Sequence, residues 1–445
     1  MTMQRASYLL SMLGLLLILA AGSRGMASAQ LLRREPMSAS EEEQPSYEYP
    51  SIDDEEPPQF DAEDSLIAMQ FTSDPYAHRD RMEMILNGEL GLAAIRYSPA
   101  SFVGGQYSDV YGEFCVFDSS LNKAEPANYP TVHAVISQSD HCGEHRYTMP
   151  LREVMQAVKD HDASSNVAVK RLPVSGLLFH EGYSGAGLIS NALATFDSAL
   201  VISEHSAVRD SLDACDVIRN RYKSEDCSQS AQQELVQDVV SLLSRTSDAS
   251  IKHLYLKLSS ASAAYLHELR SLYPDAKWAF VYRTAEEVLA KNMQRKRNKT
   301  CIKARRNPST ALSAKSNQYN VDLEYLSHHE VCALHLSTLL DAAVKEHDES
   351  GTGMLISYND VILQNADAIV EDVLPYFGLQ NEIDSDPQGV KDRVKGVLSM
   401  RSNSVGKFDP EDRKWKGEHI EVTEEVGTAI RVFMSNSMDP IMRIR

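Results

Sequence analysis

A glycine-rich turn near the middle of the chain is the stretch whose residues could most directly do chemistry. Residues 177–195 read LLFHEGYSGAGLISNALAT, an apolar strand followed by a turn and then a helix. Glycine lacks the Cβ atom that would crowd such a turn, so backbone N–H groups can converge on an anion where the helix begins. The sequence therefore predicts an anion-binding turn, with a phosphate-type group as its ligand.

This turn differs from the phosphate loop of ordinary ATPases and GTPases. Gly182 and Gly187 stand where that loop has glycines, but Leu188 and Ile189 follow them. An NTPase needs Lys and then Ser or Thr at these two positions, to hold the outer phosphates and Mg²⁺. The sequence therefore argues against a kinase or NTPase. We expect no metal, and a phosphate-binding relative that works without the Lys stays open.

Alternating strands and helices from residue 174 onward must position this turn. Five segments are typical of buried strands: Leu177–His180, Ala199–Ser203, His253–Leu258, Trp278–Tyr282 and Met354–Ser357. Amphipathic spacing predicts helices over Leu188–Thr195, Ala231–Ser244, Ala261–Leu272, Glu286–Arg297 and Val331–Lys345, with a late helix around Val422–Met434. This rhythm predicts an α/β fold with a central parallel sheet, and ligands of such sheets bind at the carboxyl ends of the strands.

A small β-rich accessory module is predicted over residues 65–165. Its segment PASFVGGQYSDVYGEFCVFD mixes aromatic and β-branched residues around a Gly-Gly pair, which favours strands and a tight turn. Residues 131–138, TVHAVISQ, are predicted as a further strand, and residues 150–161 as a helix. The module shows no residue pattern that points to chemistry.

The N-terminal residues read as a targeting segment followed by a linker. Arg5 precedes a short apolar run and then small residues, the order of a secretory signal peptide over residues 1–29, with an uncleaved signal anchor as the alternative. Residues 30–64 are rich in acids and Pro, and the stretch 35–64 has twelve acids and no Lys or Arg. Such a segment is predicted to be a disordered acidic linker. The net charge of −19 argues against a nucleic-acid partner.

Six cysteines fit a secreted chain. In an oxidising compartment their even number suggests disulfides, and Cys115–Cys142 and Cys215–Cys227 are plausible local pairs, with free buried thiols as the alternative. The sequence Asn298-Lys299-Thr300 is a glycosylation sequon, which would make the chain a glycoprotein if that side is luminal.

Four segments taken together suggest a family. They are the turn Tyr183–Leu188, the strand LVISE ending at Glu204, the segment YPDAKWAFVYRTAEEVLAKN from Tyr273, and the segment MLISYNDVILQNADAIVEDVLPYFGL from Met354. Their order and spacing over residues 174–380 resemble the P-loop sulfotransferases, which use 3′-phosphoadenosine 5′-phosphosulfate (PAPS). The resemblance implies a three-layer P-loop fold for residues 174–445.

The resemblance also implies a set of cofactor-binding residues. In that family the first turn holds the 5′-phosphosulfate. The corresponding turn in this chain consists of Tyr183, Ser184, Gly185, Ala186, Gly187 and Leu188. The Arg at the end of the family's PDAK strand binds the 3′-phosphate, as does a Ser eight residues later. These positions are Arg283 and Lys291 in this chain.

Three departures fall on the turn itself. Tyr183 stands where the family has Arg or Lys, and Ala186 and Gly187 replace its hydroxyl residues. A charge-assisted hydrogen bond contributes about 1.5–3 kcal/mol, so these changes weaken a cofactor site. Two hypotheses follow: an active PAPS-dependent sulfotransferase, or a catalytically lapsed module that binds an anion or a partner.

Sulfuryl transfer to an alcohol needs a base near the acceptor and a cation near the bridging oxygen. Glu204, at the end of the second strand, is the carboxylate best placed for the base, with His205 and His180 as rivals. Lys257 could supply the cation. The alternative is that these side chains are only helix caps and edge charges.

Two segments of the sequence are rich in Lys and Arg. Residues 291–306 hold eight Lys or Arg and no acid, and a second run comprises Lys407, Arg413, Lys414 and Lys416. Such runs attract anions, which here means PAPS, an acidic glycan or anionic headgroups, or else they are solvated surface. The hypothesis is thus a sulfotransferase-like protein of the secretory pathway, luminal in the Golgi or secreted, that acts on a glycan or another hydroxyl acceptor and meets the membrane only through its N-terminal anchor.

Overall fold

The computed structural model describes Tyr76 and residues 79–118, 121, 125, 129, 131–164, 168–294, 300–362, 366–399 and 422–438. The predicted signal segment, the acidic linker, Asn298 and the basic run of residues 407–416 lie outside these residues. Within the ranges just given, no helix combines the length and the apolar character that a bilayer span requires.

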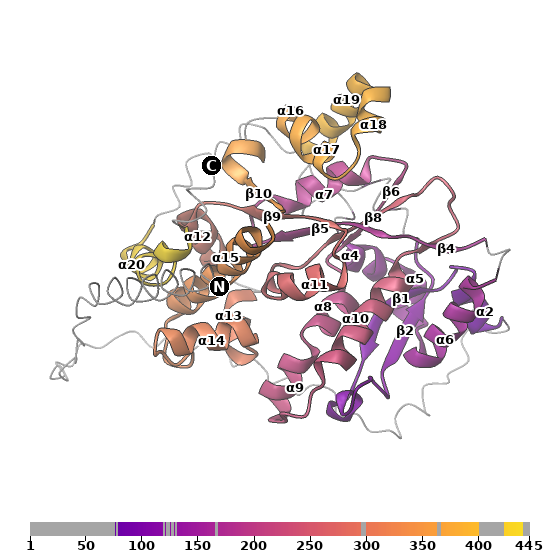
Figure 1. Cartoon of the computed structure of the whole chain (residues 1–445), viewed down its shortest axis with the longest axis horizontal. Helices are drawn as coiled ribbons and strands as arrows, with labels where there is room; N and C mark the ends of the chain where they lie inside the picture. The colour runs from indigo at the N-terminus through magenta and orange to yellow at the C-terminus, as the bar shows by residue number, and fades with distance from the viewer. Residues whose placement is uncertain are drawn as a thin grey trace, which may run out of the picture. The chain divides into compact units, whose positions relative to one another are not determined.

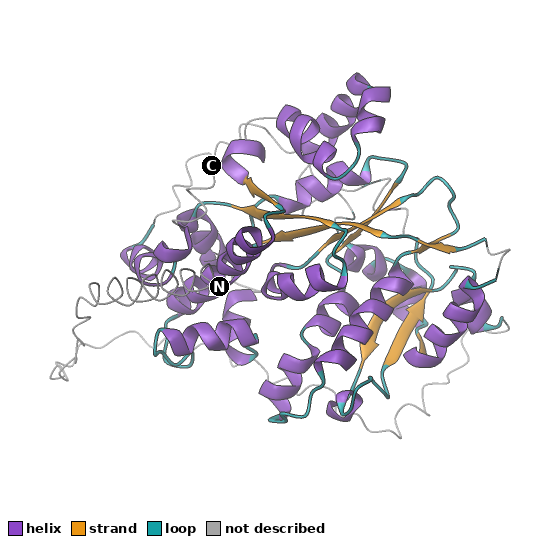
Figure 2. Cartoon of the chain, viewed as in Figure 1, coloured by secondary structure: helices purple, strands orange, loops and turns teal. Residues whose placement is uncertain are grey.

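A parallel sheet of five strands lies at the centre of the fold, as Figures 1 and 2 show. Its strands, in the spatial order β10-β9-β5-β8-β6, are β10 (Met354–Ser357), β9 (Lys277–Tyr282), β5 (Val174–His180), β8 (His253–Lys257) and β6 (Ala199–Ser203). Neighbours pair in parallel throughout, and Leu177 of β5 lies opposite both Leu256 and Trp278. The predicted α/β class with a central parallel sheet is therefore confirmed, and each predicted strand is present.

Side chains of the sheet alternate between two apolar cores. Leu177 and Phe179 of β5 join one core, while Leu178 between them joins the other. The same alternation in β9 places Trp278 and Phe280 on one face and Ala279 on the opposite face. Because both faces are buried, the strands are continuous apolar runs, and this is why the sequence revealed them.

Helices cover both faces of the sheet (Figure 1). One core includes α7 (Ala186–Ala194), η4 (Tyr358–Ile362), α16 (Ala366–Ala368), η5 (Ile369–Val373), α17 (Leu374–Tyr376), α18 (Gln380–Ser385) and α19 (Pro387–Leu398). The other includes α8 (Ser206–Leu212), α9 (Ala214–Tyr222), α10 (Gln229–Leu243), η3 (Ser260–Tyr265), α11 (Leu266–Leu272), α12 (Ala285–Gln294), α13 (Thr300–Arg306), α14 (Thr310–Gln318), α15 (His328–Ser350) and α20 (Glu424–Phe433). The result is a sheet between two helical layers.

A small antiparallel sheet precedes the parallel one. Its order is β1 (Gly91–Arg96), β2 (Tyr111–Cys115) and β3 (Tyr147–Pro150), with α2 (Arg81–Leu86), η2 (Pro99–Phe102), α4 (Val132–Ser137), α5 (Asp140–Glu144) and α6 (Leu151–Asp162) around it. Leu92 and Phe114 of this sheet join the same core as Val236 of α10. A two-stranded ladder of β4 (Lys170–Arg171) and β7 (Arg245–Thr246) follows. The boundaries of an independent module at 65–165 stay a prediction.

One predicted strand in this region is wrong. Within residues 131–138, Val132–Ser137 form the helix α4 rather than a strand. Val132, Val135 and Ile136 are its buried residues, and their spacing of three and four suits a helix. Thr131 also caps the helix, because its hydroxyl accepts the N–H of Ala134 at 3.2 Å. A short β-branched run can adopt either structure, and here the cap and the packing favour the helix.

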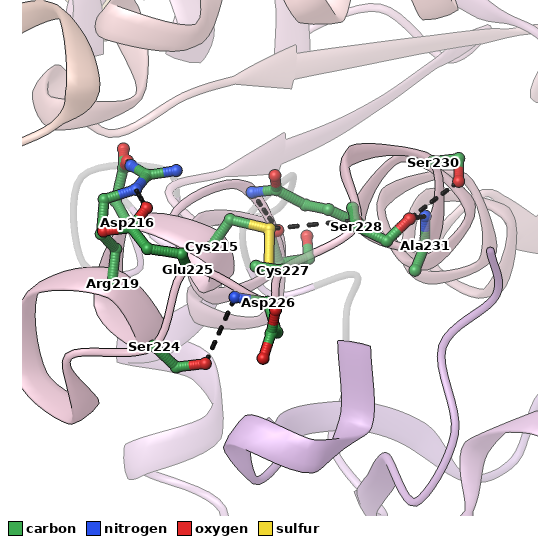
Figure 3. Close-up of a disulfide and its surroundings, with 12 residues drawn as sticks. Cys215, Asp216, Arg219, Ser224, Glu225, Asp226, Cys227, Ser228, Ser230 and Ala231 are labelled. Carbon is green, nitrogen blue, oxygen red and sulfur yellow. Dashed lines mark hydrogen bonds and ion pairs between the residues drawn. A yellow bond between two sulfur atoms is a disulfide. The ribbon is translucent and has the colours of Figure 1, made fainter. Parts of the chain in front are cut away.

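Three disulfides join the six cysteines. Both pairs predicted from sequence, Cys115–Cys142 and Cys215–Cys227, are formed, and Cys301–Cys332 links α13 to α15. Figure 3 shows the Cys215–Cys227 bridge, which joins the start of α9 to the start of α10. Cys227 immediately precedes Ser228, the N-cap of α10. Free buried thiols are thereby excluded.

The Cys115–Cys142 bridge should contribute measurably to stability. It closes a loop with a sequence separation of 27, for which the chain-entropy model gives about 3–4 kcal/mol. We expect Cys115→Ser/Cys142→Ser to lower the free energy of urea unfolding by that amount. The matched control is Cys215→Ser/Cys227→Ser, whose shorter separation of 12 should give a slightly smaller loss. A loss under about 1 kcal/mol for the first variant would contradict the expectation.

Candidate functional site

The glycine turn lies between β5 and α7 and has an unusual backbone. Gly182, Tyr183 and Gly185 all have positive φ angles, of 88°, 52° and 84°. At Gly185 a Cβ atom would come within 2.7 Å of the Tyr358 ring, so glycine is required both by φ and by space. Tyr183 adopts the left-handed region without being glycine, a strain that is typical of functional sites.

The start of α7 has no side-chain cap. Its N-cap is Gly185, which offers no side chain to cap the helix. The first N–H groups of any helix lack intrahelical acceptors, and they carry the positive end of the helix dipole. In addition, the fully buried hydroxyl of Ser184 has no hydrogen-bond partner among the described residues. The turn thus contains one buried donor that no described residue accepts from, while the role of its residues in binding an anion stays a prediction.

Three predicted residues meet beside this turn, at the carboxyl ends of adjacent strands. Lys257 ends β8 and lies opposite Ser203 of β6, and the N–H of Glu204 donates to the Lys257 carbonyl at 2.7 Å. The Lys257 ammonium forms an ion pair with Glu204 Oε1, and His180 Nε2 lies 3.5 Å from the same oxygen. The expectation that a carboxylate, a cation and an imidazole gather at this edge thus agrees with their positions, while their roles stay predictions.

Opposing effects set the protonation of this cluster. Burial acts to raise the pKa of Glu204, but the Lys257 charge and the hydrogen bond from His180 outweigh it and hold that pKa well below its usual range. Burial, followed by the Lys257 charge, lowers the pKa of His180. At neutral pH the cluster therefore holds an ionised Glu204 and a neutral His180.

Hydrogen bonds fix the orientation of the His180 ring. The N–H of Gly182 donates to Nδ1 at 2.9 Å, which assigns the proton to Nε2, and Nε2 lies 3.1 Å from the Leu258 carbonyl. His180 therefore connects the glycine turn to the Glu204–Lys257 pair. Glu204 itself has a positive φ of 51°, the second strained non-glycine residue at this edge.

A pocket opens beside the pair. Its volume is about 10 Å³, and its lining includes Ile202, Glu204, Val208, Arg209, Lys257 and Ser259. That is room for about one water molecule, far less than a small-molecule site offers. An acceptor larger than water would therefore have to approach the Glu204 carboxylate from its solvent-exposed side.

His205 is engaged elsewhere. It is buried, its Nε2 donates to the Leu92 carbonyl at 2.9 Å, and its Nδ1 accepts the N–H of Ala207 at 3.1 Å as the cap of α8. Burial lowers its pKa to about 4. Both ring nitrogens therefore serve the structure, which favours the helix-cap interpretation over a role as base.

Arg283 follows β9 and is also already paired. Its buried guanidinium makes a bidentate contact with Glu287, at 2.9 Å through both Nε and Nη2, and lies 4.2 Å from the centre of the Tyr358 ring. Burial opposes ionisation of Glu287, but the hydrogen bonds from Arg283 and Thr284 hold its pKa below its usual value. Lys291, the other predicted 3′-phosphate residue, is half-buried two turns later on α12.

Glu181 is a site residue that the sequence analysis missed. Its side chain is 2% exposed, and its Oε1 accepts the N–H of Arg283. Burial raises its pKa to about 8, against smaller opposing effects of that hydrogen bond and of the Arg283 charge. One signal in the sequence could have revealed Glu181: it is an acidic residue that follows the apolar strand ending at His180 and immediately precedes Gly182.

One group of metal-ligand types occurs in the part of the chain that the structure describes. His267, Glu346 and Glu349 lie together on α11 and α15. His267 Nδ1 is 2.9 Å from Glu346, and Arg270 Nε lies 3.7 Å from the same carboxylate. These contacts account for the group without an ion.

Comparison with known proteins identifies no family for this chain. No protein-family model matches the chain, and no curated protein matches it. Among solved structures, sulfotransferase STF9 from Mycobacterium avium is 11% identical with a TM-score of 0.35, over 73% of this chain and 86% of that one. A sulfotransferase domain from the curacin biosynthetic pathway is 12% identical with a TM-score of 0.32, over 62% and 98%. These scores are too low to show a shared family, and the α/β class stands on the sheet topology.

Proposed function

We propose that this chain is a sulfotransferase-like protein that binds PAPS and transfers its sulfuryl group to a hydroxyl acceptor, such as a glycan. The observation that supports the proposal best is the ion pair of Glu204 and Lys257 beside a glycine turn that holds the unpartnered Ser184 hydroxyl. The two features lie at the ends of adjacent parallel strands, so an anion in the turn and an acceptor beside the ion pair would be neighbours.

The residues of the turn fit an anionic group. Ser184 Oγ and the first N–H groups of α7 would donate to the phosphosulfate, and PAPS would supply the sulfuryl group for transfer. The fit is poorer at Arg283, because Glu287 already neutralises its charge. A 3′-phosphate would have to displace Glu287 or bind elsewhere.

Glu204 and Lys257 would divide the chemistry between them. Glu204 would accept the proton of the acceptor hydroxyl, yet its low pKa makes it a weak base while Lys257 is bound to it. An anion that attracts the Lys257 ammonium would weaken the ion pair and raise the pKa of Glu204 toward its usual value. Glu204 would thus become an effective base only when the anionic ligand is bound.

The second candidate function is anion or partner binding without transfer. It is favoured by the paired state of Arg283, by the absence of a cation at Tyr183 and by the absence of hydroxyl groups at Ala186 and Gly187. Binding and transfer can be measured separately. Calorimetry with adenosine 3′,5′-bisphosphate tests the site, and incubation with sulfur-labelled PAPS and acidic or neutral glycans tests transfer.

The outcomes separate the two functions. Binding together with label transfer that Glu204→Gln abolishes would support the enzyme, and binding without transfer would support the lapsed module. No heat and no thermal shift at millimolar ligand would rule out the PAPS site. Unchanged affinity in Arg283→Ala would show that the 3′-phosphate does not bind at Arg283.

Restoring the missing cation should tighten binding. Tyr183→Arg keeps a non-glycine residue at the same φ of 52° and adds a charged donor to the turn. A charge-assisted hydrogen bond contributes about 1.5–3 kcal/mol, so the affinity for adenosine 3′,5′-bisphosphate should rise roughly 10- to 150-fold by calorimetry. Tyr183→Phe is the uncharged control and should stay near wild type. An unchanged affinity in Tyr183→Arg would count against the placement of the phosphate.

We also propose the secretory pathway as the location, either the Golgi lumen or outside the cell. The three disulfides are compatible with an oxidising compartment. The signal segment and the sequon at Asn298 remain predictions, and protease protection and glycosidase treatment of the expressed protein would test both.

A further inference from the structure

The carboxyl group of Glu181 is buried at the glycine turn in an incompletely satisfied state. Its Oε1 accepts one hydrogen bond, from the backbone N–H of Arg283, and its Oε2 has no partner within the described ranges. Ser184 Oγ, three residues later in the same turn, is likewise buried and unpartnered. Two unused polar side-chain atoms therefore lie in the turn that precedes α7.

The surroundings of Glu181 favour a neutral acid. A buried carboxylate needs a cation or several donors, and a single N–H is not enough. Among the described residues, Arg283 is the charged side chain that lowers the pKa of Glu181, and its guanidinium is bound to Glu287 and stacked on Tyr358. A protonated Glu181 removes the buried charge and gains an O–H group that can donate.

The other titratable groups at this edge belong to separate contacts. His180, the residue before Glu181, accepts the Gly182 N–H at Nδ1 and contacts the Leu258 carbonyl through Nε2. Lys257 is paired with Glu204. Arg283 and Glu287 satisfy each other. The proton on Glu181 is therefore not shared with a neighbouring acid or base.

We propose that Glu181 is a protonated hydrogen-bond donor to the bound anion and replaces the cation that this glycine turn lacks. Its Oε1 keeps the hydrogen bond from Arg283, while the hydroxyl at Oε2 and the hydroxyl of Ser184 donate to the ligand. The inference rests on the proposed anion site of the previous subsection. Neutral donors of this kind suit a fully ionised sulfate or phosphate ester, which only accepts hydrogen bonds.

This arrangement couples anion binding to pH. Above the pKa of Glu181, which burial raises to about 8, the free protein loses the proton and the carboxylate repels the ligand. Affinity should then fall about tenfold for each further pH unit, because the protonated fraction falls tenfold. Binding in that range should also take up one proton per anion.

Glu181→Gln is the decisive variant, since its amide oxygen can accept from Arg283 and its NH₂ group can donate without titrating. We would measure the affinities for adenosine 3′,5′-bisphosphate and for inorganic sulfate by calorimetry from pH 6.5 to 9.5, in buffers of different ionisation enthalpy. Wild type should bind well up to pH 8 and then weaken, with proton uptake. Glu181→Gln should hold the acid-pH affinity within about threefold throughout, without proton uptake.

Asp213→Asn is the matched control. Burial raises the pKa of Asp213 to about 7, but this residue lies at the junction of α8 and α9, outside the turn. Its replacement should leave the pH profile of binding unchanged.

The other outcomes overturn one or both of the proposals. If Glu181→Gln keeps the wild-type pH profile, or loses binding while folded, Glu181 is not the donor. If sulfate binds with the expected profile but the bisphosphate does not bind at millimolar concentration, the PAPS proposal fails and the inference about Glu181 stands. If wild type binds neither anion, both fail.

Discussion

Glu204→Gln should destabilise the protein far more than its partly exposed position suggests. Glu204 is 34% exposed, but the Lys257 side chain that it pairs with is only 6% exposed. The substitution leaves a buried ammonium with an amide oxygen in place of a carboxylate. Loss of one partner from a buried ion pair costs about 3–5 kcal/mol, and we expect about 3 kcal/mol in urea unfolding at pH 7.

Lys257→Met should be milder, because it leaves the more exposed partner behind. Water can reach the unpaired Glu204 carboxylate, so we expect a loss of about 1–2 kcal/mol. The double variant Glu204→Gln/Lys257→Met should be more stable than Glu204→Gln alone, since it removes the stranded cation. Strictly additive losses would show that the pair does not interact energetically.

The surface pair of Lys345 and Glu349 gives the matched control. Its side chains are 74% and 57% exposed and lie one helical turn apart on α15. Exposed pairs contribute about 0–1 kcal/mol. Lys345→Met should therefore change stability by less than about 0.5 kcal/mol.

The strands of the central sheet could be predicted closely from the sequence. Ala199–Ser203 and Met354–Ser357 match β6 and β10 to the residue. Strands buried on both faces are continuous apolar runs, and this signal is strong. The failure at residues 131–138 has the same origin, because a short apolar run does not by itself distinguish a strand from a helix.

Strand ends also made part of the candidate site predictable. Parallel strands place their carboxyl ends at one edge, so Glu204, Lys257 and His180 could be expected together before any contact was known. The sequence could not predict which of these side chains pair with one another, because pairing depends on strand register and on side-chain packing. The third disulfide, Cys301–Cys332, depends in the same way on how α13 lies against α15.

The charge pairing of Arg283 could have been predicted in part. Arg283 was expected to bind a 3′-phosphate, which stays a prediction, and in the structure it is paired with Glu287 one helical turn later. The i, i+4 spacing of the two residues was visible in the sequence, but their contact was not. The state of Glu181 was not visible, because it follows from burial and from one unpartnered oxygen.

Stability should depend on pH through Glu181, with a sign that can be worked out. Its pKa is about 8 in the folded protein, above the ordinary value of 4.5 that applies when it is unfolded. Between these two values the folded state keeps the proton and the unfolded state releases it, so the free energy of unfolding falls as pH rises. Above pH 8 both states are ionised and the loss is complete. The shift corresponds to about 3–5 kcal/mol.

Glu181→Gln should remove this loss, because glutamine cannot ionise. The free energy of urea unfolding of the variant, minus that of wild type, should rise steadily from pH 5 to 8 and then level off. Glu225→Gln replaces an 84% exposed glutamate and should give a flat difference over the same range. A flat difference for Glu181→Gln as well would mean that the buried carboxyl is ionised in the folded protein. It could then not donate a hydrogen bond to an anion.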